Sequence, residues 1–351
     1  MDIKNVKEFK TWVLDAFYKD IHHLEENNYD YARFSYDGVD RSKEFHIGIH
    51  CTYMDWFISN AENIFTAFSR LADDKSKSLY LDLIRFRLAG HLHMRINSNV
   101  PNLASEAKKF KEIFREEKSN IVSSGIFGEL VFYDAEWNGV RYTLDSIRDA
   151  LALIPTLVYR QYFFERNGVV IKPEPGDYII DGGACTGDTA VVFSKSVGPS
   201  GAIYAFDLVQ NHIDICKYNF SRPGFENIKL FEYGLADKTV EAPPIQLSHY
   251  APGFRVGEQP LPLCRIDDLV VAGKITKIDF IKLDIEGSEM DAIKGALSSI
   301  ARFKPKLAIS IYHKPDDLFE ICNFLHEQGL GYKFYIDHYT IHAEETVLYC
   351  R

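Results

Sequence analysis

The chain has 351 residues, which suits two domains because single hydrophobic cores stop growing at about 250–300 residues. Hydrophobic residues make up 46% and charged residues 26%, the balance of an ordinary globular protein. The formal net charge of −10 argues against broad binding to phosphate backbones, and no dense run of lysine or arginine offsets it. We therefore expect no nucleic-acid partner.

The six cysteines are scattered and none forms a C-x-x-C pair, so neither a zinc site nor a disulfide framework is indicated. The first residues lack the charged-then-apolar pattern of a secretory signal. No apolar run approaches the ~20 residues that span a bilayer. We expect a cytoplasmic protein with no membrane span.

Residues 1–118 show the texture of a mainly helical N-terminal domain. Apolar residues recur there at three- and four-residue steps, as in Phe9, Trp12, Val13, Phe17 and Ile21. Exposed aromatic stripes on such helices would suit a homo-oligomer interface or a cap over an acceptor pocket. A plain packing role is the alternative.

The sequence pattern of residues 119–170 predicts a hairpin and a helix that lead into the core. Asn138-Gly139 is a strong hairpin signal between two short strands. A helix is expected over 147–164, ended by Asn167-Gly168.

Residues 171–351 alternate short apolar strands with helices, which predicts a parallel sheet covered on both faces. The expected strands are 178–181, 201–207, 228–233, 280–284 and 307–311, with 332–336 and 346–350 as a closing pair. The expected helices cover 186–196, a segment ending near 220, a segment beginning near 289, and 316–327. Residues 238–263 hold five of the 13 prolines and predict a long loop. The fold class is therefore α/β, with a doubly wound, Rossmann-like sheet.

A glycine-rich turn follows the first of these strands, between Asp181 and Asp188. Gly183 and Gly187 would let the backbone approach a ligand at the start of the next helix. A plain tight turn is the alternative. Asp207 ends the second strand, where a carboxylate can bind both ribose hydroxyls of a nucleoside. Capping of the next helix is the alternative role for Asp207.

The glycine spacing decides between nucleoside cofactors. The dinucleotide fingerprint G-x-G-x-x-G does not fit the positions of Gly182, Gly183 and Gly187. The pattern Asp-x-Gly-x-x-x-Gly instead resembles the first motif of S-adenosylmethionine-dependent methyltransferases, although Cys185 stands where many of those enzymes have a glycine.

Acidic residues cluster after the fourth strand in the segment Lys282-Leu-Asp-Ile-Glu-Gly-Ser-Glu. Asp284 and Glu286 are candidates for a general base, and His313 after the fifth strand is a third because imidazole titrates near neutral pH. Alternatively, Glu286 and Glu289 are surface acids at the start of a helix, where the helix dipole favours negative charge. A divalent cation held by Asp284, Glu286 and Glu289 is an alternative, since hard cations favour carboxylates, but we assign no metal.

Four segments in order resemble FkbM-type methyltransferases over about residues 129–351. They are Gly176-Asp-Tyr-Ile-Ile-Asp-Gly-Gly-Ala-Cys-Thr-Gly-Asp-Thr, Tyr204-Ala-Phe-Asp, Lys282-Leu-Asp-Ile-Glu-Gly-Ser-Glu, and Pro305-Lys-Leu-Ala-Ile-Ser-Ile-Tyr-His-Lys-Pro-Asp-Asp-Leu. The late segments Asp337-His-Tyr-Thr and Glu344-Glu-Thr-Val-Leu-Tyr fit as well. Within that family Ala-Cys before Gly-Asp is an accepted variant, which accounts for Cys185.

The resemblance implies a methyltransferase fold that uses S-adenosyl-L-methionine, with a hydroxyl of a sugar, glycan or natural product as the typical acceptor. It places Asp181, Gly183 and Asp188 at the methionine end, Asp207 at the ribose, and Gly234 and Leu235 near the adenine. The remaining residues assigned to the cofactor site are Gly182, Ala184, Cys185, Gly187, Thr189 and Leu208.

Methyl transfer from a sulfonium is a direct displacement, so the enzyme mainly aligns the acceptor hydroxyl and removes its proton. His249 and Arg255 in the long loop are candidates for acceptor contacts, with a solvated arginine as the alternative. A lipid, peptide or polyketide-type acceptor remains open. So does a non-catalytic cofactor-binding module, although the acids at 181, 207, 284 and 286 speak against it.

Overall fold

The computed structural model describes residues 3–24, 43–98, 108, 113–121, 128–148, 153–245 and 260–351. The chain divides into two compact units. One comprises Met1–Glu106 and Lys314–Cys350, and the other comprises Ala107–His313 and Arg351. Each unit is described by itself.

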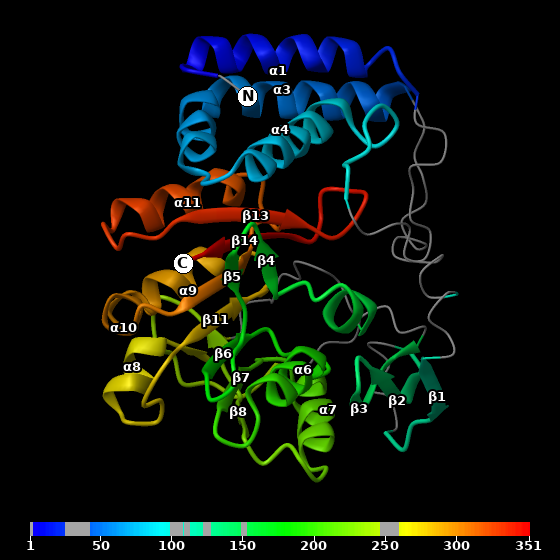
Figure 1. Ribbon diagram of the computed structural model, residues 1–351, viewed down its shortest axis with the longest axis vertical. Coiled ribbons are helices and arrows are strands. Elements are labelled where there is room, and N and C mark those ends of the chain that lie inside the picture. Colours follow the sequence, from blue (N-terminus) through cyan, green and yellow to red (C-terminus); the bar gives the residue numbers. More distant parts are fainter. Residues whose placement is uncertain are drawn as a thin grey trace. The chain divides into compact units, whose positions relative to one another are not determined.

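The first unit contains the N-terminal helices α1 (Val6–Asp20), α3 (Lys43–Arg70) and α4 (Asp74–Ala89), which pack against one another (Figure 1). The buried ring of Phe9 lies 5.3 Å from that of Phe68 and 5.5 Å from that of Phe65, measured between centroids. These apolar positions recur at helical spacing, so burying one stripe stabilises the helices. The expected helical N-terminal region is confirmed for α1, α3 and α4.

The C-terminal residues of the chain belong to the same unit. Helix α11 (Asp317–Glu327) packs on α3, and β13 (Phe334–His338) pairs antiparallel with β14 (Thr346–Cys350). Arg70 donates to the backbone and side-chain oxygens of Asn323 at 3.2 and 2.7 Å. The compact units therefore differ from the expected ranges 1–118, 119–170 and 171–351, which remain a proposal.

The second unit is built on five parallel strands in the order β12-β11-β6-β7-β8. They are β6 (Tyr178–Gly182), β7 (Ala202–Phe206), β8 (Ile228–Phe231), β11 (Phe280–Leu283) and β12 (Lys306–Ser310). The helices α6 (Asp188–Val197) and α7 (Gln210–Phe220) lie to one side of these strands in Figure 1, and α8 (Ile266–Val271), α9 (Glu289–Gly295) and α10 (Leu297–Phe303) lie to the other. The expected doubly wound α/β class is confirmed.

The strand order reverses between β6 and β11. From β6 the chain proceeds outward to β7 and β8, and it then returns to place β11 on the other side of β6. Ligands of open α/β sheets bind outside the carboxyl ends of the strands at such a reversal. The glycine-rich turn after β6 and the acids after β11 both lie there.

An antiparallel sheet precedes the parallel strands, with β1 (Phe114–Lys118), β2 (Leu130–Trp137) and β3 (Val140–Ile147) in that order. The hairpin predicted at Asn138-Gly139 is confirmed, and both residues have the positive φ (50° and 76°) that its turn requires. Strand β1 corrects the expectation that the helical texture continues to residue 118. Its chain pairs with β2 instead.

The helix expected over 147–164 is wrong in the part that the structure describes. Strand β3 continues to Ile147, a single π-helical turn covers Ile154–Val158, and β4 (Phe164–Arg166) begins where the helix was expected to end. Asn167-Gly168 is the turn of a second hairpin, between β4 and β5 (Val169–Ile171). Asn-Gly supplies positive φ to a hairpin as readily as to a helix end, so the local signal was ambiguous.

Parts of the loop at 238–263 are described. A bridge joins Val240 to Leu263, and β9 (Gly234–Leu235) pairs with β10 (Leu263–Cys264) in parallel. His249 and Arg255 lie outside the described residues, so their expected acceptor contacts remain a proposal. Within the described ranges no helix is long and apolar enough to cross a bilayer.

Candidate functional site

The glycine-rich turn lies tightly against the neighbouring strand ends. A Cβ atom added to Gly183, whose φ is +81°, would meet the carbonyl oxygen of Asp284 at 1.9 Å. At Gly187, with φ +86°, it would meet the ring of Phe220 at 2.7 Å. The amides of Gly183 and Ala184 both donate to Phe206 O at 3.0 Å. The turn is thus fixed to the ends of β7 and β11, and both glycines are required for close approach and for backbone conformation.

Lys282 on β11 supports this turn through its ammonium group. Its ammonium donates to the carbonyl oxygens of Gly182 and Gly183 at 2.9 and 2.8 Å and lies 3.1 Å from Asp181 Oδ1. Burial disfavours the charge on Lys282, but Asp181, Asp284 and Asp188 outweigh it and raise the pKa of the ammonium. The second oxygen of Asp181 accepts from Thr189 Oγ1 at 2.7 Å. Asp181 and Thr189, both expected at the cofactor, are therefore buried groups that hold the turn.

Asp207 connects the same turn to the start of α7. Its Oδ2 accepts from the amide of Cys185 at 2.9 Å and lies 3.1 Å from His212 Nδ1, and its Oδ1 accepts from the amide of Val209 at 2.9 Å. The carboxylate lies at the carboxyl end of β7, the position that the ribose assignment requires. Cys185 is half-buried, and loss of hydration beside Asp188 and Asp207 raises the pKa of its thiol well above the usual range. Cys185 is therefore a protonated thiol at neutral pH.

Asp188 begins α6 with its carboxylate buried. Thr156 Oγ1 donates to its Oδ2 at 3.1 Å. Burial raises the pKa of Asp188 to about 6, because the compensating charge of Lys282 is partly cancelled by Asp181. The group therefore titrates close to neutral pH.

Gly234 and Leu235, expected near the adenine, lie together with Leu208, which was assigned to the cofactor site. A Cβ atom on Gly234 would meet Leu208 Cδ2 at 2.6 Å, and one on Gly182 would meet Leu235 Cδ1 at 2.9 Å. Leu208 and Leu235 thus pack beside the turns that follow β7 and β6.

Asp284 is the acidic group at the carboxyl end of β11. The hydroxyl of Tyr162 donates to its Oδ2 at 2.7 Å, the hydroxyl of Tyr312 donates to its Oδ1 at 3.2 Å, and His313 Nε2 lies 3.3 Å from Oδ1. Burial alone would raise the pKa of this carboxyl, but His313, Lys282 and the two hydroxyls outweigh burial and lower it. Asp284 is accordingly ionised at neutral pH.

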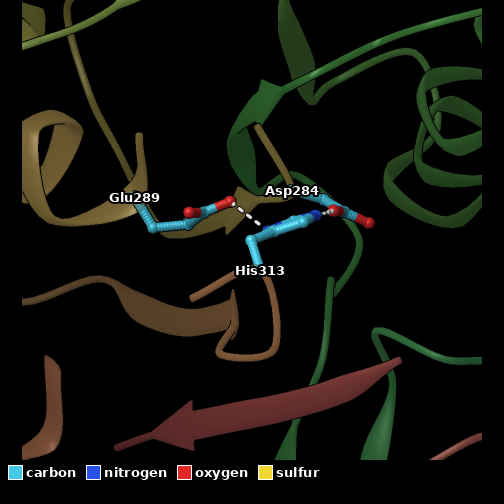
Figure 2. A group of neighbouring side chains, drawn as sticks. All are labelled: Asp284, Glu289 and His313. Atoms are coloured by element: carbon cyan, nitrogen blue, oxygen red, sulfur yellow. Dashed lines mark ion pairs between the residues drawn. The ribbon is translucent and has the colours of Figure 1, made fainter. Parts of the chain in front are cut away.

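His313 lies between two carboxylates, as Figure 2 shows. Its Nδ1 lies 2.9 Å from Glu289 Oε1, and its Nε2 faces Asp284 and, at 3.7 Å, Glu286 Oε2. Burial disfavours the imidazolium, but the hydrogen bond to Glu289 and the three negative charges raise the pKa of His313 to about 9. All three expected catalytic residues, Asp284, Glu286 and His313, are thus brought together, with His313 protonated at neutral pH.

The composition of this cluster also raises the question of a metal ion. Asp284, Glu289 and His313 each offer one ligand atom, and these atoms lie within 4.8 Å of one another. However, both Asp284 oxygens already accept hydrogen bonds from tyrosines, and Glu289 Oε1 accepts from the amide of Ile285 at 2.8 Å. A proton on His313 is the alternative to a cation between these carboxylates.

Several residues at the site were not predicted as functional from the sequence. They are Tyr162, Tyr312, Lys282, His212 and Thr156. Lys282 gave a signal, because a cation within the otherwise apolar strand Phe280-Ile-Lys-Leu needs a buried partner. Tyr162 gave none, because it contacts Asp284 across 122 positions of sequence.

Comparison with known proteins identifies the class of this fold. The structure is similar to the crystal structure of Methyltransferase FkbM from Methylobacillus flagellatus KT, with a TM-score of 0.53 and 20% sequence identity. The match covers 85% of this chain and 60% of that one, so the chain spans less than two thirds of that protein. The fold is that of a Rossmann-like methyltransferase.

A family model also matches part of the sequence. Residues 181–334 match the model described as Methyltransferase FkbM domain. The resemblance drawn from the motifs is confirmed for that segment.

Weaker similarities extend to other solved methyltransferases. Fibrillarin of Aeropyrum pernix, solved with natively bound S-adenosyl-L-methionine, is 13% identical at a TM-score of 0.35, over 68% of this chain and 98% of that one. A SAM-dependent methyltransferase of Aquifex aeolicus is 14% identical at 0.33, over 58% and 91%. Comparison with curated protein sequences found no match.

Proposed function

We propose that this chain transfers a methyl group from S-adenosyl-L-methionine to a hydroxyl of an acceptor, and that the acceptor is a sugar or glycan. One observation carries the proposal. The ionised carboxylate of Asp284 follows β11 at the point where its own carbonyl oxygen touches Gly183 of the glycine-rich turn. A group suited to hold a hydroxyl thus adjoins the turn that suits the cofactor.

The charges around the turn favour a cationic cofactor. Asp181, Asp188, Asp207, Asp284, Glu286 and Glu289 lie at these strand ends, where Lys282 and His313 supply positive charge. S-adenosylmethionine carries a sulfonium and an ammonium, and its demethylated product has lost the sulfonium charge. An acidic site therefore attracts the donor more strongly than the product.

In the proposed binding mode the backbone from Gly182 to Gly187 passes under the methionine part of the cofactor, and Asp188 faces its ammonium. Asp207 binds the ribose hydroxyls. Leu208, Gly234 and Leu235 flank the adenine. Asp181 acts indirectly, since it pairs with Lys282 and keeps the turn in place.

Asp284 would orient the acceptor hydroxyl for in-line attack on the methyl group. A carboxylate of low pKa is a weak base toward a free alcohol. However, the hydroxyl becomes a protonated ether as the new C–O bond forms, and that species is a far stronger acid than any carboxylic acid. The proton can therefore pass to Asp284 as the sulfide leaves, so a low pKa is compatible with the role.

The test is a mass-spectrometric screen of nucleotide sugars and glycans with S-adenosylmethionine, run on wild type and Asp284→Asn. We expect a one-methyl mass gain on a hydroxylated acceptor. In Asp284→Asn we expect kcat to fall by about 10²–10⁴ with cofactor affinity retained. Asp291→Asn is the matched control, because Asp291 is an exposed acid in the first turn of α9.

Two outcomes of the screen would contradict the proposal. Methylation of only lipid, peptide or polyketide acceptors would refute the acceptor class. Cofactor binding without methyl transfer to any acceptor would indicate a binding module. We also expect the protein to act in the cytoplasm, since all six cysteines are unpaired, and we expect residues 1–118 to support any homo-oligomer. Gel filtration with light scattering would test the latter.

A further inference from the structure

Glu289 is a carboxylate with no solvent exposure, in the first turn of α9. Its Oε1 accepts from the amide of Ile285 at 2.8 Å and lies 2.9 Å from His313 Nδ1 (Figure 2). Burying a charged carboxylate is strongly unfavourable unless it is paired. A helix-start acid needs only a surface position to benefit from the helix dipole, so the complete burial of Glu289 against His313 requires another explanation.

The two nitrogens of His313 face carboxylates on opposite sides. Nδ1 faces Glu289 on α9, and Nε2 faces Asp284 and Glu286 from the turn after β11. A neutral imidazole donates from one nitrogen and presents a lone pair on the other. With both carboxylates ionised, either neutral tautomer would aim a lone pair at a carboxylate, and only the imidazolium presents an N–H to each side.

We propose that Glu289 is a positioning residue that holds His313 as an imidazolium, with Nε2–H directed at Asp284, and thereby fixes the orientation and ionisation of the Asp284 carboxylate. The inference rests on the proposed function for the role of Asp284. It adds a residue that the acceptor does not touch. Glu289 reaches Asp284 only through the imidazole ring.

The other groups around the ring are compatible with this role. The ring of Tyr312 lies 4.1 Å from that of His313, and its hydroxyl donates to Asp284. Tyr162 donates to the other Asp284 oxygen, and Lys282 contributes a positive charge from within β11. Asp284 thus keeps its two hydroxyl donors in either state of His313, and it has the imidazolium charge 3.3 Å away only when His313 is protonated.

The experiment is an NMR titration of the His313 ring in the full chain without acceptor, with its signal identified by its absence in His313→Asn. We expect wild-type His313 to titrate near pH 9, well above the ordinary value of 6.5. In Glu289→Gln the amide oxygen can still meet both the amide of Ile285 and His313 Nδ1, because Oε1 makes both contacts in wild type, but the negative charge opposite Nδ1 is lost. We therefore expect a His313 midpoint at least one pH unit lower. The control Asp291→Asn should titrate as wild type does.

Kinetics supply the second readout. We expect Glu289→Gln to lower kcat by up to about 10²-fold with little change in KM for the cofactor, and to move the alkaline limb of the pH–kcat profile downward with the His313 midpoint. A purely structural role would lower the amount of folded enzyme and leave that limb in place.

Two results would overturn the inference. A wild-type His313 midpoint below 7 would do so without any variant, which covers the case that Glu289→Gln fails to fold. So would loss of activity on chelation with recovery on adding Mn²⁺ or Mg²⁺, because the cluster would then hold a cation. The NMR titration needs no methyl transfer, so failure of this inference is distinguishable from failure of the proposed function.

Discussion

The buried pair of Lys282 and Asp181 gives the sharpest stability prediction. Lys282 is 2% and Asp181 0% exposed, and their charged atoms are 3.1 Å apart. At an effective dielectric of ~20, two unit charges at that distance attract by about 5 kcal/mol, which the loss of hydration on burial opposes. Lys282→Met keeps the aliphatic length but leaves Asp181 buried without its cation. We expect a loss of about 3–5 kcal/mol in the free energy of unfolding.

A double-mutant cycle isolates the pair from the rest of the strand. We expect Asp181→Asn to restore part of the stability lost in Lys282→Met, because the amide can still accept from Thr189 without a buried charge. The coupling free energy should be about 2 kcal/mol, measured by urea titration of the four proteins with far-UV circular dichroism. The exposed pair Lys217–Glu232 serves as the control cycle and should give under ~1 kcal/mol. Equal coupling in the two cycles would refute the assignment of Lys282 as the support of the turn.

Three further predictions concern the turn and the strand ends. Gly183→Ala should destabilise the protein by more than Gly273→Ala. Both residues have positive φ, so a side chain at either position costs about 1–2 kcal/mol. Of the two, only Gly183 would bring the added Cβ against a backbone oxygen. Equal losses in the free energy of unfolding, measured by urea titration, would contradict the close approach. Asp207→Ala should weaken S-adenosylmethionine binding by at least about tenfold, the loss of one charge-assisted hydrogen bond, in calorimetry. The exposed Asp214→Ala should leave binding unchanged, and unchanged affinity in Asp207→Ala would remove the ribose assignment. Asp188→Asn should stabilise the protein, relative to wild type, more at pH 8 than at pH 4. The folded state raises the pKa of Asp188 to about 6, so the stability contributed by its proton is complete below pH 3.8 and lost as pH rises through 6. At ~1.4 kcal/mol per pKa unit, the gain in the free energy of unfolding is at most about 3 kcal/mol. If urea titrations give the same difference between wild type and Asp188→Asn at both pH values, this explanation is wrong.

The sequence predicts the core of the second unit well because its signals are local. Apolar strands such as Phe280–Leu283 alternate with helices, and every acid predicted at a strand end lies at the carboxyl edge of the sheet. The helix expected over 147–164 failed because Asn167-Gly168 turns a hairpin instead of ending a helix, and the segment around Pro155 forms a single π-helical turn. The sequence also does not predict that His313 is protonated. Its protonation depends on partners at both nitrogens, and sequence spacing does not reveal which groups face them.

The cofactor turn and the acidic cluster are connected through a single strand. Lys282 lies on β11, and Asp284 follows the last residue of that strand, Leu283. Lys282 holds the carbonyl oxygens of Gly182 and Gly183, while the carbonyl of Asp284 abuts Gly183. Displacing β11 by a fraction of an ångström would therefore move both the turn and the carboxylate. Methyl transfer depends on the alignment of donor and acceptor, so under the proposed function the same strand, with Lys282 buried in it, would position both sides of the reaction.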